Sequence, residues 1–252
     1  MIEKNKQGAV LWLTIKHPPA NALSTKVLKS LDEAITEAEN DESVRAIVLH
    51  GEGRFFVAGA DIKEFKGAQV KHLQKMVNYC LIRLNNKKPV IAAIHGAALG
   101  GGLELAMVCT IRIATEDCKL GLPETNLGLL PAYGGTQRLP KLVGPHKATE
   151  MMLTGIPITG VQAHQWGLVN DVAKDESELL EKAGILADTI ASKSTVTTSR
   201  ILDLIQHAAS GQSLEEGLKK EAKYFDECFD SEDSKEGITA FLEKRKPVFS
   251  NR

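Results

Sequence analysis

Short apolar runs recur along the first half of this chain, separated by longer amphipathic stretches. Residues 10–15, 44–49, 90–94 and 111–114 are mostly aliphatic, with many β-branched side chains. Continuous apolar runs of this length predict buried strands. We therefore expect a sheet whose strands are separated by helical segments.

Apolar residues with helical spacing mark the segments between these strands. Ser24 is a favourable N-cap for one helix, and a second helix is expected over about 72–86. Strands that alternate with helices predict an α/β core. The apolar positions that follow Ser24 are Val27, Leu28, Leu31, Ile35 and Ala38.

A faint internal repeat links two of the predicted strands. Segments 46–62 and 90–105 both run from an apolar strand through His-Gly and a glycine-containing loop to a candidate helix start. The pattern predicts a spiral of repeated strand–helix turns, although it rests on two copies.

The character of the chain changes beyond about residue 195, where it becomes helical and charged and no strand pattern returns. We divide the chain into an α/β core at 1–195, which carries the candidate site, and a helical C-terminal region at 196–252. No low-complexity linker separates them, so we expect the helices to pack on the core or on a neighbouring subunit.

Composition and charge narrow the function classes. The 252 residues suit one large domain or a domain with a small appendage. A formal net charge of −1 gives no basic excess, which argues against binding to nucleic acid or to a membrane surface. The longest apolar run, 90–109, is interrupted by His95, Glu104 and glycines, so we do not expect a membrane span.

The cysteines and the N-terminus bear on the compartment. Four scattered cysteines without a C-x-x-C pair argue against a zinc site and a disulfide framework, and fit a reducing compartment such as the cytoplasm. The first ten residues carry charges and no apolar segment, so no signal peptide is expected.

The stretch "ALGGGLELAM" (98–107) is the first candidate for chemistry. Glycines at a strand-to-helix junction let the backbone turn sharply and let a ligand approach, and free N–H groups at a helix start favour an anion. A tight packing junction explains the glycines equally well. Glu104 is harder to explain structurally, because buried carboxylates are rare unless they are paired. It is either a helix-terminus acid satisfied locally or a catalytic carboxylate.

A second carboxylate, Glu124, follows Pro123 twenty residues later. A proline and an acid can simply open a helix. The two glutamates bracket the strand predicted at 111–114, so chain geometry permits both to return to one end of it. Two carboxyl groups in one apolar cleft can hold different proton states, which equips a site to add or remove water or a proton.

The first repeat offers a matching element in "FFVAGADIKEF" (55–65). Ala60 has an approachable N–H, Asp61 suits a helix cap, and Lys63 can face a phosphate or simply solvent. Equivalent junctions ending near Ala60 and Gly101 can aim two backbone N–H groups at one point, which defines an oxyanion hole.

Rival chemistries have little support. The seven histidines include no H-E-x-x-H and no metal spacing, so we expect His50 and His95 to be core or hydrogen-bonding residues and expect no metal. G-x-S-x-G, the G-K-[ST] of a phosphate loop and G-x-G-x-x-G are also absent from the sequence.

Four segments together resemble the enoyl-CoA hydratase/isomerase (crotonase) family, and specifically its short-chain hydratases. They are "RFFVAGADIKEF", "IAAIHGAALGGGLELAMVCTIRIA", "KLGLPETNLGLLPAYGGTQRLPKLVG" and "FLEKRKP". The resemblance spans nearly the whole chain, with the motifs in order. It implies a spiral of repeated ββα units, a helical C-terminal region, and a homotrimer or dimer of trimers.

The resemblance also implies roles for individual residues. Ala60 and Gly101 match the oxyanion-hole amides, and Glu104 and Glu124 match the two catalytic glutamates. The residues implied in coenzyme A binding are Ala58, Ala60, Ile62, the neighbouring Asp61 and Lys63, and, in the C-terminal region, Phe225 and Lys244, the lysine across a subunit boundary.

The function implied is reversible addition of water to a 2-enoyl-CoA in fatty-acid β-oxidation, without a cofactor beyond the coenzyme A of the substrate. Glu104 would activate water and Glu124 would protonate the α-carbon. Isomerases, decarboxylases and dehalogenases share the oxyanion hole but alter the acids, and isomerases commonly keep only the acid at the position of Glu124. A silent CoA- or RNA-binding scaffold is a further alternative. Ala132 departs from the glycine that hydratases often have near the catalytic water.

Overall fold

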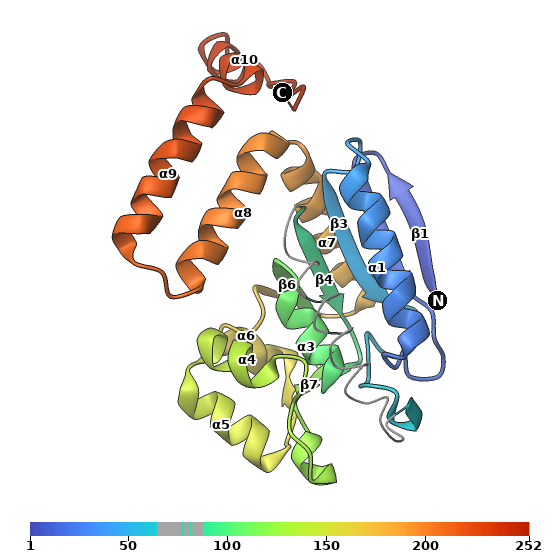
Figure 1. Cartoon of the computed structure of the whole chain (residues 1–252). Helices are drawn as coiled ribbons and strands as arrows, with labels where there is room; N and C mark the ends of the chain where they lie inside the picture. The colour runs from blue at the N-terminus through green and yellow to red at the C-terminus, as the bar shows by residue number, and fades with distance from the viewer. Residues whose placement is uncertain (65–76, 78–80, 82–87, 252) are drawn as a thin grey trace.

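The computed structural model describes residues 1–64, 77, 81 and 88–251 of the chain, and it has a mixed α/β core with helices projecting from it (Figure 1). The larger sheet has the strand order β1-β2-β3-β4-β6-β9. Strand β1 pairs with β2 in the antiparallel sense, and the other pairs are parallel. These strands are β1 (Ile2–Gln7), β2 (Val10–Ile15), β3 (Ala46–Gly51), β4 (Val90–Ile94), β6 (Ile111–Thr115) and β9 (Asp171–Ala173).

The parallel strands are apolar on both sides because helices cover both faces of the sheet. On β3, Ile47 and Leu49 belong to the core cluster with α1 (Thr25–Asn40). Ala46 and Val48 belong to the cluster with α7 (Glu176–Ala191). The side chain of Ser24 accepts a hydrogen bond from the Val27 N–H and caps α1, as predicted.

A second, smaller sheet has the order β5-β7-β8. Its strands are β5 (Ala97–Leu99), β7 (Lys119–Gly121) and β8 (Ile158–Thr159). The chain enters the large sheet at β4 and the small sheet at β5, and then repeats this step with β6 and β7. In the preceding turn, β3 is followed by Val57, which bridges to Ala98 of β5. The repeated architecture predicted from the two His-Gly segments is therefore confirmed.

Short helical segments connect the two sheets and build the rim of the candidate site. They include α3, which follows β5 directly, and η2, which follows β7. Their bounds are η1 (Ile62–Glu64), α3 (Gly101–Val108), η2 (Glu124–Leu127), α4 (Gly135–Val143), α5 (Pro145–Thr154) and α6 (Gly160–Gln165). The helix predicted at about 72–86 lies outside the described residues, apart from Val77 and Leu81.

The C-terminal region consists of α8 (Thr195–Ala209), α9 (Leu214–Phe229) and α10 (Glu232–Leu242). Figure 1 shows α9 and α10 extending away from the sheets. Large apolar side chains lie exposed along them, including Phe229 at 57% and Phe241 at 82%. The predicted α/β class with a helical C-terminal region is thus confirmed, whereas the domain boundary at residue 195 stays a prediction.

Candidate active site

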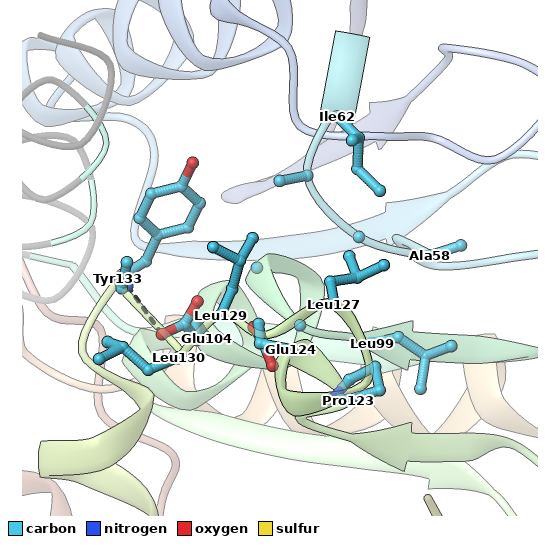
Figure 2. Close-up of a pocket in the computed structure, with 15 residues that line it drawn as sticks. Ala58, Ile62, Leu99, Glu104, Pro123, Glu124, Leu127, Leu129, Leu130 and Tyr133 are labelled. Carbon is cyan, nitrogen blue, oxygen red and sulfur yellow. Dashed lines mark hydrogen bonds between the residues drawn. The ribbon is translucent and has the colours of Figure 1, made fainter. Parts of the chain in front are cut away.

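A cavity of about 270 Å³ opens where the loop after β3 meets the start of α3 and the segment from η2 to α4 (Figure 2). Its wall is mostly apolar, and its acidic side chains are Glu104 and Glu124. The lining residues are Ala58, Gly59, Ala60, Ile62, Leu99, Gly100, Gly101, Glu104, Pro123, Glu124, Leu127, Leu129, Leu130, Ala132 and Tyr133.

The glycine run is required because neighbouring atoms lie too close to its backbone to leave room for side chains. Gly100 has φ 52° and ψ −124°, and a Cβ there would lie 3.0 Å from Oε1 of Glu124. A Cβ on Gly102 would lie 2.1 Å from the carbonyl oxygen of Val57, closer than real contacts allow. The glycines therefore bring the first turn of α3 against both the 57–60 segment and Glu124.

Two backbone N–H groups line this cavity from the two repeats. The Leu99 N–H donates to the Val57 carbonyl at 3.1 Å, which fixes the 57–60 segment beside the start of α3. Within the described part of the chain, no acceptor bonds the N–H of Ala60 or of Gly101. Because Gly101 is the first residue of α3, its N–H has no intrahelical partner and sits at the positive end of the helix dipole. Both amides are available to a ligand oxygen.

Glu104 is held in the first turn of α3 with 1% of its surface exposed. Its Oε1 accepts hydrogen bonds from the backbone N–H of Tyr133 at 2.8 Å and of Gly135 at 2.7 Å. Burial raises the pKa of Glu104 to about 7, and the charge of Glu124 adds to this, while the two amides and Arg138 pull the pKa down. A carboxyl group with a pKa near 7 can exchange a proton at neutral pH.

Glu124 is the first residue of η2 and lines the same cavity, where Figure 2 shows it beside Glu104. Its Oε2 is buried and meets no hydrogen-bond partner among the described residues. Burial raises the pKa of Glu124 as well, which favours the protonated form. The two acids therefore differ in their hydrogen bonding. Two backbone N–H groups stabilise the anion of Glu104, whereas Oε2 of Glu124 has no partner among the described residues.

Ala132 of the loop that holds Glu104 was expected near the catalytic water from the sequence, but the hydrogen bonds from the amides of this loop to Glu104 were not predicted. Gly134 has φ 96° and caps α4, and a Cβ on Gly135 would lie 2.9 Å from Oε1 of Glu104. Arg138 Nη1 donates to the Tyr133 carbonyl at 2.8 Å and so anchors the loop from within α4. The available signal was the Gly-Gly pair opening a polar helix, "GGTQR".

The predicted coenzyme A residues of the first repeat are only partly gathered at the cavity. Ala58, Ala60 and Ile62 line it, and Ile62 is 59% exposed at its mouth. The side chain of Asp61 caps η1 by accepting a hydrogen bond from the Lys63 N–H at 3.0 Å. Asp61 and Lys63 lie beside the cavity residues in sequence but do not line it.

Phe225 and Lys244 do not line this cavity either. Phe225 is 66% exposed on α9 and stacks on Phe229, with ring centroids 6.0 Å apart. Lys244 follows α10 with φ 58°. Because α9 and α10 lie away from α3 in Figure 1, either residue would reach a site of this kind only on another subunit.

The two histidines expected to be core or hydrogen-bonding residues, His50 and His95, each lie within hydrogen-bonding distance of a neighbouring group. Nε2 of His50 lies 2.9 Å from Oγ1 of Thr14, and Nε2 of His95 lies 2.9 Å from the Gly53 carbonyl. Among the described residues, no group of three or more His, Cys, Asp and Glu side chains is arranged to hold a metal. No helix in the described ranges is both long and apolar enough to cross a membrane.

Around one apolar cavity the site thus combines an acid held by amides, a second acid, and two backbone N–H groups. The second acid has an oxygen without a partner among the described residues, and the two N–H groups meet no acceptor there. A model of the enoyl-CoA hydratase/isomerase family matches residues 5–252 of the chain. The chain belongs to this family.

Named relatives and solved structures agree with this assignment. The chain is 55% identical to a Bacillus subtilis protein named "Probable enoyl-CoA hydratase", with 95% of each sequence covered. It is 42% identical to a short-chain-enoyl-CoA hydratase of Clostridium acetobutylicum, covering 98% of this chain and 97% of the relative. A crystal structure of an enoyl-CoA hydratase from Bacillus anthracis superposes with a TM-score of 0.96 at 35% identity, covering 100% and 99% of the two chains.

Proposed function

We propose that this protein is an enoyl-CoA hydratase that adds water reversibly across the 2,3 double bond of a 2-enoyl-CoA, giving a 3-hydroxyacyl-CoA. The observation that carries the proposal is the pair of dissimilar glutamates in one cavity with two free amides. A Syntrophomonas wolfei relative named crotonyl-CoA hydratase, 39% identical over 100% of this chain, supports a short 2-enoyl substrate.

The thioester carbonyl oxygen is placed at the N–H groups of Ala60 and Gly101. As water attacks C3, electron density moves through C2 onto this oxygen, and the two donors stabilise the resulting enolate. The positive end of α3 adds to the same stabilisation.

The two glutamates handle the protons of the added water. Ionised Glu104 takes a proton as the water oxygen bonds to C3, and protonated Glu124 delivers a proton to C2, so that one water is added in total. The pKa of Glu104, about 7, keeps a useful fraction ionised at neutral pH. Burial raises the pKa of Glu124 as well.

Coenzyme A is part of the substrate in this proposal, and no separate cofactor is assigned. Ala58, Ala60 and Ile62 contact the nucleotide end of the substrate beside the cavity mouth, with Asp61 and Lys63 near them. Phe225 and Lys244 contact it from the C-terminal region.

The direct test follows the enone absorbance of crotonyl-CoA on addition of the protein. Loss of absorbance with formation of 3-hydroxybutanoyl-CoA is expected. Conversion of a 3-enoyl-CoA to the 2-enoyl isomer without hydration would instead identify an isomerase. Binding of acyl-CoA without turnover of either substrate would identify a silent scaffold.

We infer that the protein assembles as a homotrimer or a dimer of trimers. The support is the row of exposed apolar side chains on α9 and α10, which a second copy would cover: Leu218, Phe225, Phe229, Ile238 and Phe241. Light scattering coupled to size-exclusion chromatography tests this, and a monomer at micromolar concentration would contradict it.

The cytoplasm and fatty-acid β-oxidation are proposed as the setting. The described cysteines Cys109, Cys118 and Cys228 are free thiols, which fits a reducing compartment. Fractionation of cells that produce the protein checks the location.

A further inference from the structure

Tyr133 lines the cavity and is almost completely buried, with 5% of its surface exposed. A Cβ on Gly101 would lie 3.1 Å from Cδ2 and 3.2 Å from Cε2 of the tyrosine ring. The ring therefore packs directly on the helix start that carries a proposed oxyanion donor. Its backbone N–H is bonded to Glu104, so the backbone of Tyr133 is fixed beside this acid.

The ring also stands on the side of the glutamates opposite the proposed coenzyme A contacts. Figure 2 shows Tyr133 at one side of Glu104 and Glu124, and Ala58 at the other. A substrate that enters past Ala58 and places C2 and C3 between the glutamates directs its acyl tail toward Tyr133. The leucines near the tyrosine do not close this path, since Leu129 is 47% exposed and Leu130 is 66% exposed on the rim.

The aromatic ring is the part of Tyr133 that packs on the start of α3. No hydrogen bond joins the Tyr133 hydroxyl to any residue that the structure describes. The backbone of Tyr133 is held on both sides, because its N–H donates to Glu104 and its carbonyl accepts from Arg138. The ring is confined by burial and by its packing on Gly101.

We propose that the ring of Tyr133 forms the end wall of the acyl subsite and restricts this enzyme to short 2-enoyl chains. The inference rests on the proposed hydratase function and extends it to the substrate class. A butenoyl group ends near the ring, whereas each further pair of methylene groups must displace it or leave the cavity.

The experiment compares kcat/KM for 2-enoyl-CoA substrates of four, six, eight and ten carbons. The wild type is expected to lose at least about 10-fold between four and eight carbons, in line with the usual worth of a methylene group in an apolar pocket. Tyr133→Ala is expected to raise the ratio of eight-carbon to four-carbon activity by about 10-fold. Tyr133→Phe, which keeps the ring, should retain the wild-type profile.

Two further variants make the comparison decisive. Leu153→Ala shortens an exposed leucine that does not line the cavity and should leave the chain-length ratio unchanged. Tyr133→Leu replaces the ring by a smaller apolar side chain and serves if the alanine variant melts at a much lower temperature. An unchanged ratio in a folded Tyr133→Ala or Tyr133→Leu protein would overturn the end-wall proposal.

Failure of the hydratase proposal would be recognised separately. If the wild type hydrates none of the substrates, calorimetric affinities for butanoyl-CoA and octanoyl-CoA replace the kinetics. The end wall then predicts tighter binding of the shorter ligand to the wild type and a gain for octanoyl-CoA in Tyr133→Ala. Equal affinities in both proteins would reject the wall.

Discussion

The carboxylate of Glu104 lies at the start of α4, where its Oε1 accepts a 2.7 Å hydrogen bond from the backbone N–H of Gly135. Glu104 belongs to α3, but its carboxylate lies at the N-terminus of a second helix, α4. The positive end of α4 stabilises the anion that burial destabilises. This balance places the pKa of Glu104 near 7 and makes the group responsive to its neighbours.

Glu104→Gln and Glu124→Gln are each expected to reduce hydration of crotonyl-CoA by roughly 10² to 10⁴, the usual worth of a positioned acid or base. Glutamine keeps the size of the side chain while removing proton transfer. Steady-state kinetics measures the loss, with circular dichroism as the folding control. A folded variant with the parental rate would exclude that residue from the mechanism.

Arg138 is expected to act as a positioning residue for Glu104. It donates a hydrogen bond to the Tyr133 carbonyl, and its positive charge lowers the pKa of Glu104. The negative charge of Glu124 on η2 raises the same pKa. Arg138→Ala should raise the pKa of Glu104 and shift the acidic limb of the kcat/KM profile to higher pH, with a rate loss of roughly 10- to 100-fold.

The lysine variant separates charge from mere packing. Arg138→Lys keeps the positive charge but replaces the forked guanidinium by a single ammonium group. The acidic limb of its kcat/KM profile should therefore lie between those of the wild type and Arg138→Ala. An acidic limb that stays in place in both variants would show that Arg138 acts only on stability.

Glu104 is also expected to make folding stability depend on pH. Its pKa is about 7 in the folded protein and 4.5 for an ordinary glutamate, so its protonated form is favoured by folding. The associated stability is fully present below about pH 4.5 and is lost as the pH rises through about 7. The melting temperature of the wild type relative to Glu104→Gln should therefore fall between pH 5 and pH 8. A constant difference across this range would contradict the raised pKa.

Removing one oxyanion donor should cost about 10² to 10³ in kcat. Gly101→Pro deletes the N–H at the first position of α3, a helix position that tolerates proline. Gly101→Ala is the matched control, because it keeps the N–H while adding a Cβ 3.1 Å from the Tyr133 ring. Parental turnover by a folded proline variant would place the thioester oxygen elsewhere.

Lys244→Ala is expected to raise KM for acyl-CoA more than it lowers kcat. A phosphate contact far from the reacting carbons provides mostly uniform binding, and its effect should shrink as salt rises. Acyl-pantetheine, which lacks the nucleotide, is the control substrate. An equal loss with both substrates would rule out a phosphate contact.

Strands with buried apolar runs were predictable from the sequence, and those without them were not. Val10–Ile15 and Val90–Ile94 form strands with the predicted bounds, whereas the strand predicted at 44–49 lies at Ala46–Gly51. Strand β1 was missed because its sequence, IEKNKQ, is polar along an exposed sheet edge. Strand β5 has three residues and carries too little periodicity to be recognised.

The candidate site was predictable in its two acids and its glycine-containing junctions, but not in the backbone amides that hold Glu104. Glu104, Glu124 and the glycine run carry a signal because acids and consecutive glycines are unusual in apolar segments. The amides of Tyr133 and Gly135 that hold Glu104 leave no mark of this kind, since every residue except proline has an N–H. Only the fold shows that the loop at 131–135 returns to α3.

The bridge between Val57 and Ala98 joins the two repeats at the level of the peptide chain. It holds the segment that leads to Ala60 beside β5, which runs directly into α3. If Ala60 and Gly101 are the donors proposed above, point substitutions during divergence can exchange the acids around the cavity while this pair of donors persists. A protein with this bridge can acquire a new reaction on a thioester by changing which carboxylates face the enolate, and it need not rebuild the cradle that stabilises it.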